Sequence, residues 1–183
     1  FDGLVFQTMS RQDGLQDVAI QQVLQDRQGQ MWIASEKGLA SYKPPRRPPA
    51  TQLQEVLADR AYDTGSPVRL PSHHQFVQFR FQGASLTTPS GRMAFAYRLQ
   101  GLEGDWQVTR QRQVRYGNLP QGQYQFQVKA IDRDLNYSVP ATVDVEVYYQ
   151  PMVNPVRLAD LALGDLFASF YESYVDQPVG TVE

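Results

Sequence analysis

The histidines are the first residues whose type could support chemistry, because two of them stand side by side. His73 and His74 are the only histidines in the sequence. Adjacent residues in an extended segment point to opposite sides, so their rings do not converge readily on one metal ion. We expect both to be solvated loop residues, with a metal site as the alternative.

A second candidate metal site lies near the end of the strand-rich region. Asp132, Asp134 and Asn136 have the D-x-D-x-N spacing that begins a calcium-binding loop. That loop also requires glycine at its sixth position and glutamate at its twelfth, where this chain has Tyr137 and Val143. We therefore predict a polar turn rather than a metal site, and we expect no metal.

Other side chains could form a catalytic pair or a ligand-binding face. Glu103 and Asp105 could act as the carboxylates of a glycoside hydrolase, but nothing fixes their separation and a polar turn explains them. A sugar- or anion-binding face could combine aromatic rings with arginines. Its members would be Trp106, Tyr116, Arg98, Arg110, Arg112 and Arg115. We favour the alternative, in which Trp106 and the tyrosines belong to the core.

Sequence motifs and composition exclude several classes of protein. There is no cysteine, no nucleophile elbow, no phosphate-binding loop and no dinucleotide fingerprint. We therefore predict no enzymatic activity, no catalytic residues and no cofactor, and the ligand-binding residues stay unknown. Seventeen basic residues against 19 acidic ones argue against nucleic acid as a partner. No apolar run approaches the length of a membrane span.

Changes in composition divide the 183 residues into four regions. Residues 1–43 contain aromatic and β-branched residues between glycine-centred turns. Residues 44–50 form a proline-rich linker, since prolines favour extended polyproline geometry over helices and ladders. Residues 51–150 contain short alternating segments, and residues 151–183 contain one basic residue against five acidic ones.

Alternation of apolar and polar residues predicts an all-β fold for the third region. Four segments, 76–81, 95–99, 124–130 and 143–148, have the period of two that is typical of half-buried strands. Turn-forming residues separate them. We predict an immunoglobulin-like β-sandwich over residues 51–150. The propensity of residues 51–60 favours a helix, whereas their position before a sandwich favours a first strand, and we predict the strand.

The acidic tail has a helical period instead. Apolar residues recur at steps of three and four, which predicts an amphipathic helix within residues 160–175. Its apolar stripe consists of Leu163, Phe167, Phe170 and Tyr174. We expect this stripe, or the region 1–43, to make the chain a homo-oligomer. The residues that follow resemble the start of a further domain.

Two stretches resemble known families. Residues 13–39 contain Asp13-Gly14-Leu15, Asp26, Gly29 and Met31-Trp32-Ile33 at spacings that resemble one blade of the two-component regulator propeller repeat. Residues 76–138 resemble the three-Y domain that follows such propellers. The positions that carry this second resemblance include Tyr97, Trp106, Tyr116, Asn118, Pro120, Gly122 and Tyr124. A glycine common in the family is replaced by Leu135-Asn136, where asparagine could supply a positive φ.

The resemblance implies the last propeller blade and sandwich of a bacterial hybrid two-component sensor ectodomain, in the periplasm or otherwise extracytoplasmic. In that family the propeller recognises a carbohydrate-type ligand, and the three-Y domain relays binding through dimer rearrangement. We therefore expect a non-enzymatic sensing and relay module. The alternative is a structural adaptor that links a propeller to another soluble domain without sensing. A glycan-processing enzyme, the third hypothesis, has no supporting residues.

Overall fold

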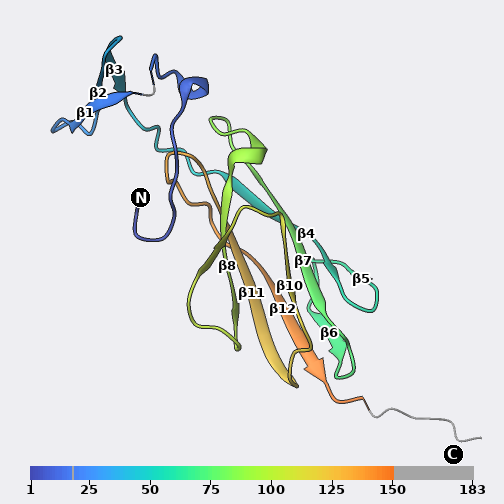
Figure 1. Ribbon diagram of the computed structural model, residues 1–183. Helices are drawn as coiled ribbons and strands as arrows, with labels where there is room; N and C mark the ends of the chain where they lie inside the picture. Colours follow the sequence, from blue (N-terminus) through green and yellow to red (C-terminus); the bar gives the residue numbers. More distant parts are fainter. Residues whose placement is uncertain (18, 151–183) are drawn as a thin grey trace, which may run out of the picture. The chain divides into compact units, whose positions relative to one another are not determined.

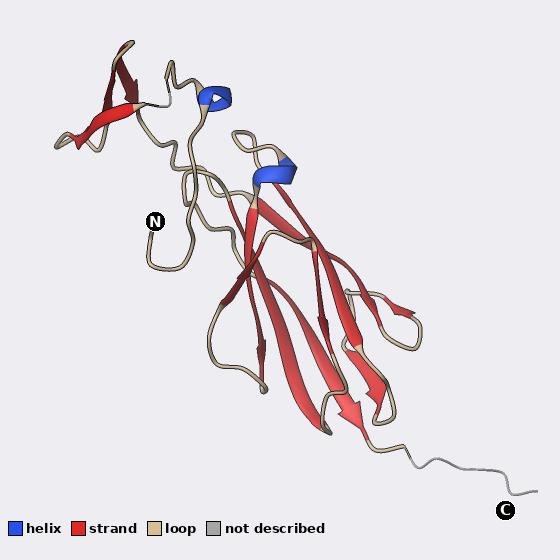
Figure 2. Cartoon of the chain, viewed as in Figure 1, coloured by secondary structure: helices blue, strands red, loops and turns tan. Residues whose placement is uncertain are grey.

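The computed structural model describes residues 1–17 and 19–150, and the regular elements of this part of the chain are almost all strands (Figure 1; Figure 2). Two short 3-10 turns, η1 (Arg11–Asp13) and η2 (Ser90–Arg92), are its helical elements. In these residues no helix is long and apolar enough to cross a membrane. The helix expected at 160–175, with its apolar stripe, lies outside the described residues.

Residues 50–148 form two sheets that face each other. The four-stranded sheet has the order β10 (Gln113–Tyr116), β7 (Val77–Ala84), β4 (Ala50–Leu57) and β5 (Ala61–Tyr62). The five-stranded sheet has the order β6 (Val68–Pro71), β12 (Ala141–Tyr148), β11 (Gly122–Ile131), β8 (Ala94–Gln100) and β9 (Gln107–Thr109). All neighbours are antiparallel except β6 and β12. The predicted β-sandwich is confirmed, and β4 shows that residues 50–57 form a strand.

Alternating side chains of both sheets meet in one apolar core. Phe79 from β7 and Phe126 from β11 are fully buried, with stacked rings whose centroids lie 3.9 Å apart. Phe81 and Phe95 extend the same aromatic cluster. Because successive residues of a strand point to opposite faces, this alternation is what the period of two in the sequence reflects.

Residues 20–42 form a third, smaller sheet. It is a meander of β1 (Ile20–Gln25), β2 (Met31–Ser35) and β3 (Gly38–Tyr42). Asp26 and Gly29, two positions of the repeat-like pattern, lie in the turn that joins β1 to β2, and Asp26 closes this turn by accepting hydrogen bonds from the backbone N–H groups of Gln28 and Gln30. The Trp32 indole also donates to Asp26, 3.1 Å away. Residues 43–49 contain no regular element.

Trp106 lies on the outer side of the five-stranded sheet, which corrects the expectation that it belongs to the sandwich core. It is partly buried and packs with Val5, Ala94, Ala96 and Ile131. Gln107 pairs with Tyr97, which packs against the main core, so the preceding residue faces the opposite way. A turn before β9 thus decides the side on which the indole lies.

Candidate functional site

An ion-paired junction joins the N-terminal segment to the sandwich. Asp13, at the end of η1, accepts hydrogen bonds from both terminal nitrogens of Arg92, each at 2.8 Å. The Arg133 guanidinium donates to the same carboxylate at 2.8 Å. Asp13 itself is held by Ser10, whose backbone N–H and hydroxyl both donate to it. One carboxylate therefore connects three chain segments.

The Asp13 side chain is almost completely buried, with 2% of its surface exposed. Its pKa is well below the usual 3.8, chiefly because Arg92 stabilises the ionised form, while burial opposes this and Arg133 adds to it. A buried carboxylate that faces two guanidinium groups stays charged at neutral pH. The junction is therefore electrostatic as well as geometric.

The third sheet reaches the same place through the last residue of β3. The Tyr42 hydroxyl donates to the Asp134 carboxylate, and the Arg133 guanidinium lies 5.9 Å from the centre of the Tyr42 ring. Burial, followed by the Asp134 hydrogen bond, raises the pKa of Tyr42 to about 12. Both the η1 segment and the β1–β3 sheet thus contact the turn between β11 and β12.

That turn is the polar turn predicted from its sequence. Asp132 is fully buried and accepts hydrogen bonds from the backbone N–H groups of Asp134 and Asn136 and from the Asn136 amide. The Asn136 amide also donates to the carbonyl oxygen of Pro45 in the linker, at 2.8 Å. The positive φ belongs to Leu135, at 62°, and not to Asn136 as expected.

The histidine prediction is wrong for His74 and holds for His73. His73 is exposed, whereas His74 is 4% exposed. Its Nδ1 lies 2.8 Å from the Pro71 carbonyl oxygen, and its Nε2 accepts from the Leu119 backbone N–H at 3.1 Å. These two contacts require a neutral ring with the proton on Nδ1. His74 is therefore a structural link between the end of β6 and the loop before β11. Among the described residues no group of histidine and carboxylate side chains could hold a metal ion.

The arginines proposed for an anion-binding face do not gather. Arg98 lies over the Trp106 ring at 4.6 Å, and Arg115 lies over Phe76 at 3.9 Å. Arg110 donates to the carbonyl oxygen of Phe6. Arg112 donates instead to Ser90. Each guanidinium is engaged with a different neighbour, so these four arginines form no common site. Glu103 accepts from Gln107, while Asp105 is exposed.

Other residues of the sandwich that carry the three-Y resemblance, or lie beside them, have structural roles. The Tyr124 hydroxyl donates to the Pro120 carbonyl oxygen at 2.8 Å and so closes the turn at residues 120–124, which contains Gly122, while Asn118 is exposed just before it. Gly101 has a φ of 100°, and a Cβ there would lie 2.8 Å from the Gln123 carbonyl oxygen. Glycine is therefore required at this turn. These residues shape the sandwich end.

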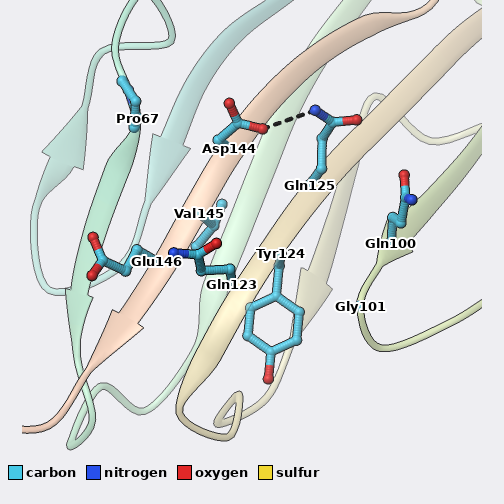
Figure 3. Close-up of a pocket in the computed structure, with 9 residues that line it drawn as sticks. All are labelled: Pro67, Gln100, Gly101, Gln123, Tyr124, Gln125, Asp144, Val145 and Glu146. Atoms are coloured by element: carbon cyan, nitrogen blue, oxygen red, sulfur yellow. Dashed lines mark hydrogen bonds between the residues drawn. The ribbon is translucent and has the colours of Figure 1, made fainter.

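A polar depression of about 620 Å³ covers the outer face of the five-stranded sheet beside this end (Figure 3). Figure 3 shows that Gln125 reaches across to Asp144, and the amide donates to the carboxylate at 2.9 Å. The neighbouring Glu146 accepts from Arg69 on β6. These groups are bonded across the strands, and no residue that lines the depression has a buried polar side-chain atom without a partner, so nothing in it points to a ligand.

Part of the sandwich matches a known protein family. Residues 87–148 match the family described as the Y_Y_Y domain. The three-Y resemblance is thereby confirmed for that stretch. The match does not include residues 13–39, whose resemblance to a propeller blade stays a prediction. No curated protein matches the sequence.

Solved structures that align with part of this chain come from two sources. The extracellular domains of two hybrid two-component systems of B. thetaiotaomicron align over 70% of this chain, at 22% and 19% identity and with TM-scores of 0.48 and 0.45. The chain spans a fifth of the length of each of those domains. Fibronectin(III)-like modules of CbhA from Clostridium thermocellum align over 56% of this chain and 100% of their own, at 14% identity and a TM-score of 0.38.

The residues of the junction were only partly visible in the sequence. Asp13 belongs to the Asp-Gly pair of the repeat-like pattern, so its position carried a signal. Arg92 and Arg133 lie 79 and 120 residues away from it, and no local pattern connects them. Such ion pairs depend on how distant loops meet, which periodicity does not report.

Proposed function

We propose that this chain is a non-enzymatic relay module of an extracytoplasmic bacterial regulator. In this proposal the sandwich transmits the state of a propeller, of which the β1–β3 sheet is one blade, to the part of the protein that follows. The family match at residues 87–148 supports a role in two-component signalling. The observation that carries the proposal is the convergence of Asp13 and Tyr42 on the turn between β11 and β12.

This convergence supports a relay because the turn joins β11, the central strand of the five-stranded sheet, to its neighbour β12. β11 and β12 pair along seven consecutive residues, from Gly122 with Val147 to Val128 with Ala141. A displacement of η1 or of β3 would act on Arg133 and Asp134 and thus on the start of β12. The opposite end of β12, at Tyr148, leads to the C-terminal segment. The path crosses the whole length of the sandwich through hydrogen-bonded elements.

The proposal also includes the ligand and the mode of transmission. In the full propeller the ligand is of a carbohydrate type, and the relay proceeds through rearrangement of a dimer. Both parts follow from the family resemblance, and the periplasmic location has the same support.

A structural adaptor without sensing is the second candidate, and one observation favours it. Asp13 is fixed by bidentate hydrogen bonds from Arg92 as well as by Arg133 and Ser10, and this arrangement is suited to a rigid connection. A rigid connection holds two domains in place whether or not a signal passes between them.

Hydrogen exchange of the Asp13→Asn variant separates these candidates. Loss of the carboxylate charge weakens both guanidinium contacts. A relay predicts faster amide exchange in residues 1–17 and also in β12, whereas an adaptor predicts a change confined to residues 1–17. Glu55→Gln is the matched control, since Glu55 forms an exposed ion pair with Arg80 on the four-stranded sheet. Unchanged exchange in β12 of Asp13→Asn would reject the relay.

We further propose that the chain forms at least a dimer at micromolar concentration. The support is the exposure of large apolar side chains on the β1–β3 sheet: Leu39 is 62% exposed, Leu24 60% and Val23 50%. Exposed apolar side chains of this kind favour association. The other proposed contact is the tail stripe of Leu163, Phe167, Phe170 and Tyr174, which lies outside the described residues. Light scattering of the whole chain and of a chain ending at residue 150 would show which contact is used.

A further inference from the structure

A groove of about 550 Å³ opens at one edge of the sandwich, where the two sheets separate. It lies between β9, the last strand of the five-stranded sheet, and β10, the last strand of the four-stranded sheet. Its volume falls within the range of about 300–1,000 Å³ that is typical of small-molecule sites. The groove is separate from the ion-paired junction, because none of the residues that line it belongs to that junction.

Amides and hydroxyls dominate the lining of the groove. Its main polar members are Gln78, Gln107, Gln111, Gln113, Thr109 and Tyr116. Each glutamine amide offers two N–H donors and a carbonyl acceptor, and each hydroxyl can donate or accept a hydrogen bond. This is the surface that complements a ligand with many hydroxyl groups.

A hydrogen-bond chain orients two of the lining groups. The Tyr97 hydroxyl donates to Oε1 of Gln107 at 2.8 Å, and Nε2 of Gln107 donates to Oε2 of Glu103 at 2.9 Å. The chain fixes the Gln107 amide and holds the Glu103 carboxylate at the groove. Groups that are already held in place lose less conformational entropy when a ligand binds.

Tyr116 supplies the second observation. Its hydroxyl oxygen is buried and forms no hydrogen bond of normal geometry among the described residues, although the Glu103 carboxylate is close enough to interact with it. Burial and the nearby Glu103 raise the pKa of Tyr116, so the phenol remains a neutral donor at physiological pH. The Tyr116 ring packs edge-on against Phe79 in the aromatic core. Packing alone would be served by phenylalanine, and a buried hydroxyl without a partner is unfavourable, so the hydroxyl points to a function in binding.

The charges around the groove decide which kind of hydroxyl-rich ligand fits. Glu103 contributes a carboxylate to the lining, and Arg115, the lining residue with a guanidinium, has that group over the ring of Phe76. One carboxylate and one guanidinium leave the lining without net charge, so the groove favours neither an anionic nor a cationic ligand. We propose that the groove binds a neutral polyhydroxylated molecule, such as a monosaccharide or disaccharide unit, directly on the sandwich. This site is independent of the relay proposed above.

The test is an NMR titration of the whole chain with D-glucose, D-xylose, maltose and cellobiose, with inorganic phosphate as the anionic probe. We expect saturable shifts of the Gln107 and Gln113 side-chain amides with at least one sugar. Tyr116→Phe should weaken the binding of that sugar by about tenfold, because one hydrogen bond to the ligand is lost. The same variant should keep or raise the melting temperature, because it removes a buried unpaired hydroxyl.

Gln82→Ala is the matched control, because Gln82 is exposed and pairs with Gln54 on the four-stranded sheet, away from the groove. It should leave both the shifts and the affinity unchanged. The proposal is overturned if no sugar gives saturable shifts at the groove, or if Tyr116→Phe binds as tightly as the unaltered chain. Tighter binding of phosphate at the same amides would overturn the assignment to neutral ligands.

Discussion

The β1–β3 sheet and the sandwich are made of similar strands but differ in what covers them. In the sandwich, Phe79, Phe81 and Phe126 are completely buried between two sheets. In the smaller sheet Ile33 is the buried apolar residue, and every residue of β1 is exposed. A single sheet has no partner layer for its apolar side chains, so strand pairing alone does not create a core.

This difference teaches how the two regions remain connected. The sandwich is stabilised by apolar burial. The N-terminal region is attached to it by the buried Val5 on the outer face of the five-stranded sheet and by polar contacts, among them those of Asp13 with Arg92 and Arg133 and that of Tyr42 with Asp134. Burial is insensitive to pH, whereas ion pairs depend on the charge of their members. The two regions should therefore respond differently to the same perturbations.

The largest expected effect is the loss of a core aromatic. Phe126→Ala should destabilise the sandwich by about 3–5 kcal/mol, because it removes a fully buried ring and leaves a cavity. Chemical denaturation followed by circular dichroism measures the change. Phe6→Ala is the control, since Phe6 is 71% exposed and should change little. Equal effects of the two substitutions would contradict the distinction between the regions.

The next effect concerns the histidine that the sandwich buries. His74→Ala should cost roughly 2–4 kcal/mol, because the Leu119 N–H and the Pro71 carbonyl oxygen both lose their partner. His73→Ala, at the exposed neighbouring position, should be nearly neutral. Thermal unfolding of the two variants compares adjacent positions directly. A larger loss for His73→Ala would show that the histidine contacts are assigned to the wrong residue.

Acid should release the N-terminal segment before the sandwich unfolds. The folded pKa of Asp13 lies below its unfolded value near 3.8, so its contribution is present above pH 3.8 and is lost as the pH falls towards the folded pKa. Hydrogen exchange of residues 1–17 should therefore accelerate in this acidic range. In Asp13→Asn the fast exchange should already occur at neutral pH. A variant with the same acid dependence as the unaltered chain would assign the effect to another carboxylate.

Alkaline pH should have a smaller effect on β3. The folded pKa of Tyr42 is about 12 against an ordinary 10, so the stabilisation present below pH 10 declines as the pH rises through about 12. Tyr42→Phe should remove this dependence and cost about 1 kcal/mol of local stability at neutral pH. Hydrogen exchange of the β3 amides measures both the pH dependence and the local stability. Tyr62→Phe provides the comparison at a tyrosine of the four-stranded sheet.

The smallest effect on folding is expected on the open faces of the smaller sheet. Leu24→Ser and Leu39→Ser should leave the melting temperature unchanged, because both side chains are more than half exposed. If the sheet mediates association, the variant with both substitutions should have a mass by light scattering closer to 20.8 kDa, the mass of one chain. A monomeric mass for the unaltered chain at high concentration would refute the proposed dimer.

Much of the sandwich could be predicted from the sequence, because strands are encoded locally. The alternation at 76–81, 95–99, 124–130 and 143–148 placed four strands, since a period of two puts every second side chain in the core. Aspartate and glycine at 26–29 likewise marked the turn of the first hairpin. Such signals depend on residues that are neighbours in the chain.

The tertiary structure alone decided what depends on distant segments. His74 is buried because Leu119 and Pro71 come together around it, and no pattern near residues 73–74 distinguishes the two histidines. The face of the five-stranded sheet on which the Trp106 indole lies is set by the turn that precedes β9 and by the pairing of β9 with β8. Asp13 meets Arg92 and Arg133 because three loops converge at one end of the sandwich. Periodicity describes which face a side chain takes, but the partner on that face is set by how the sheets and loops pack.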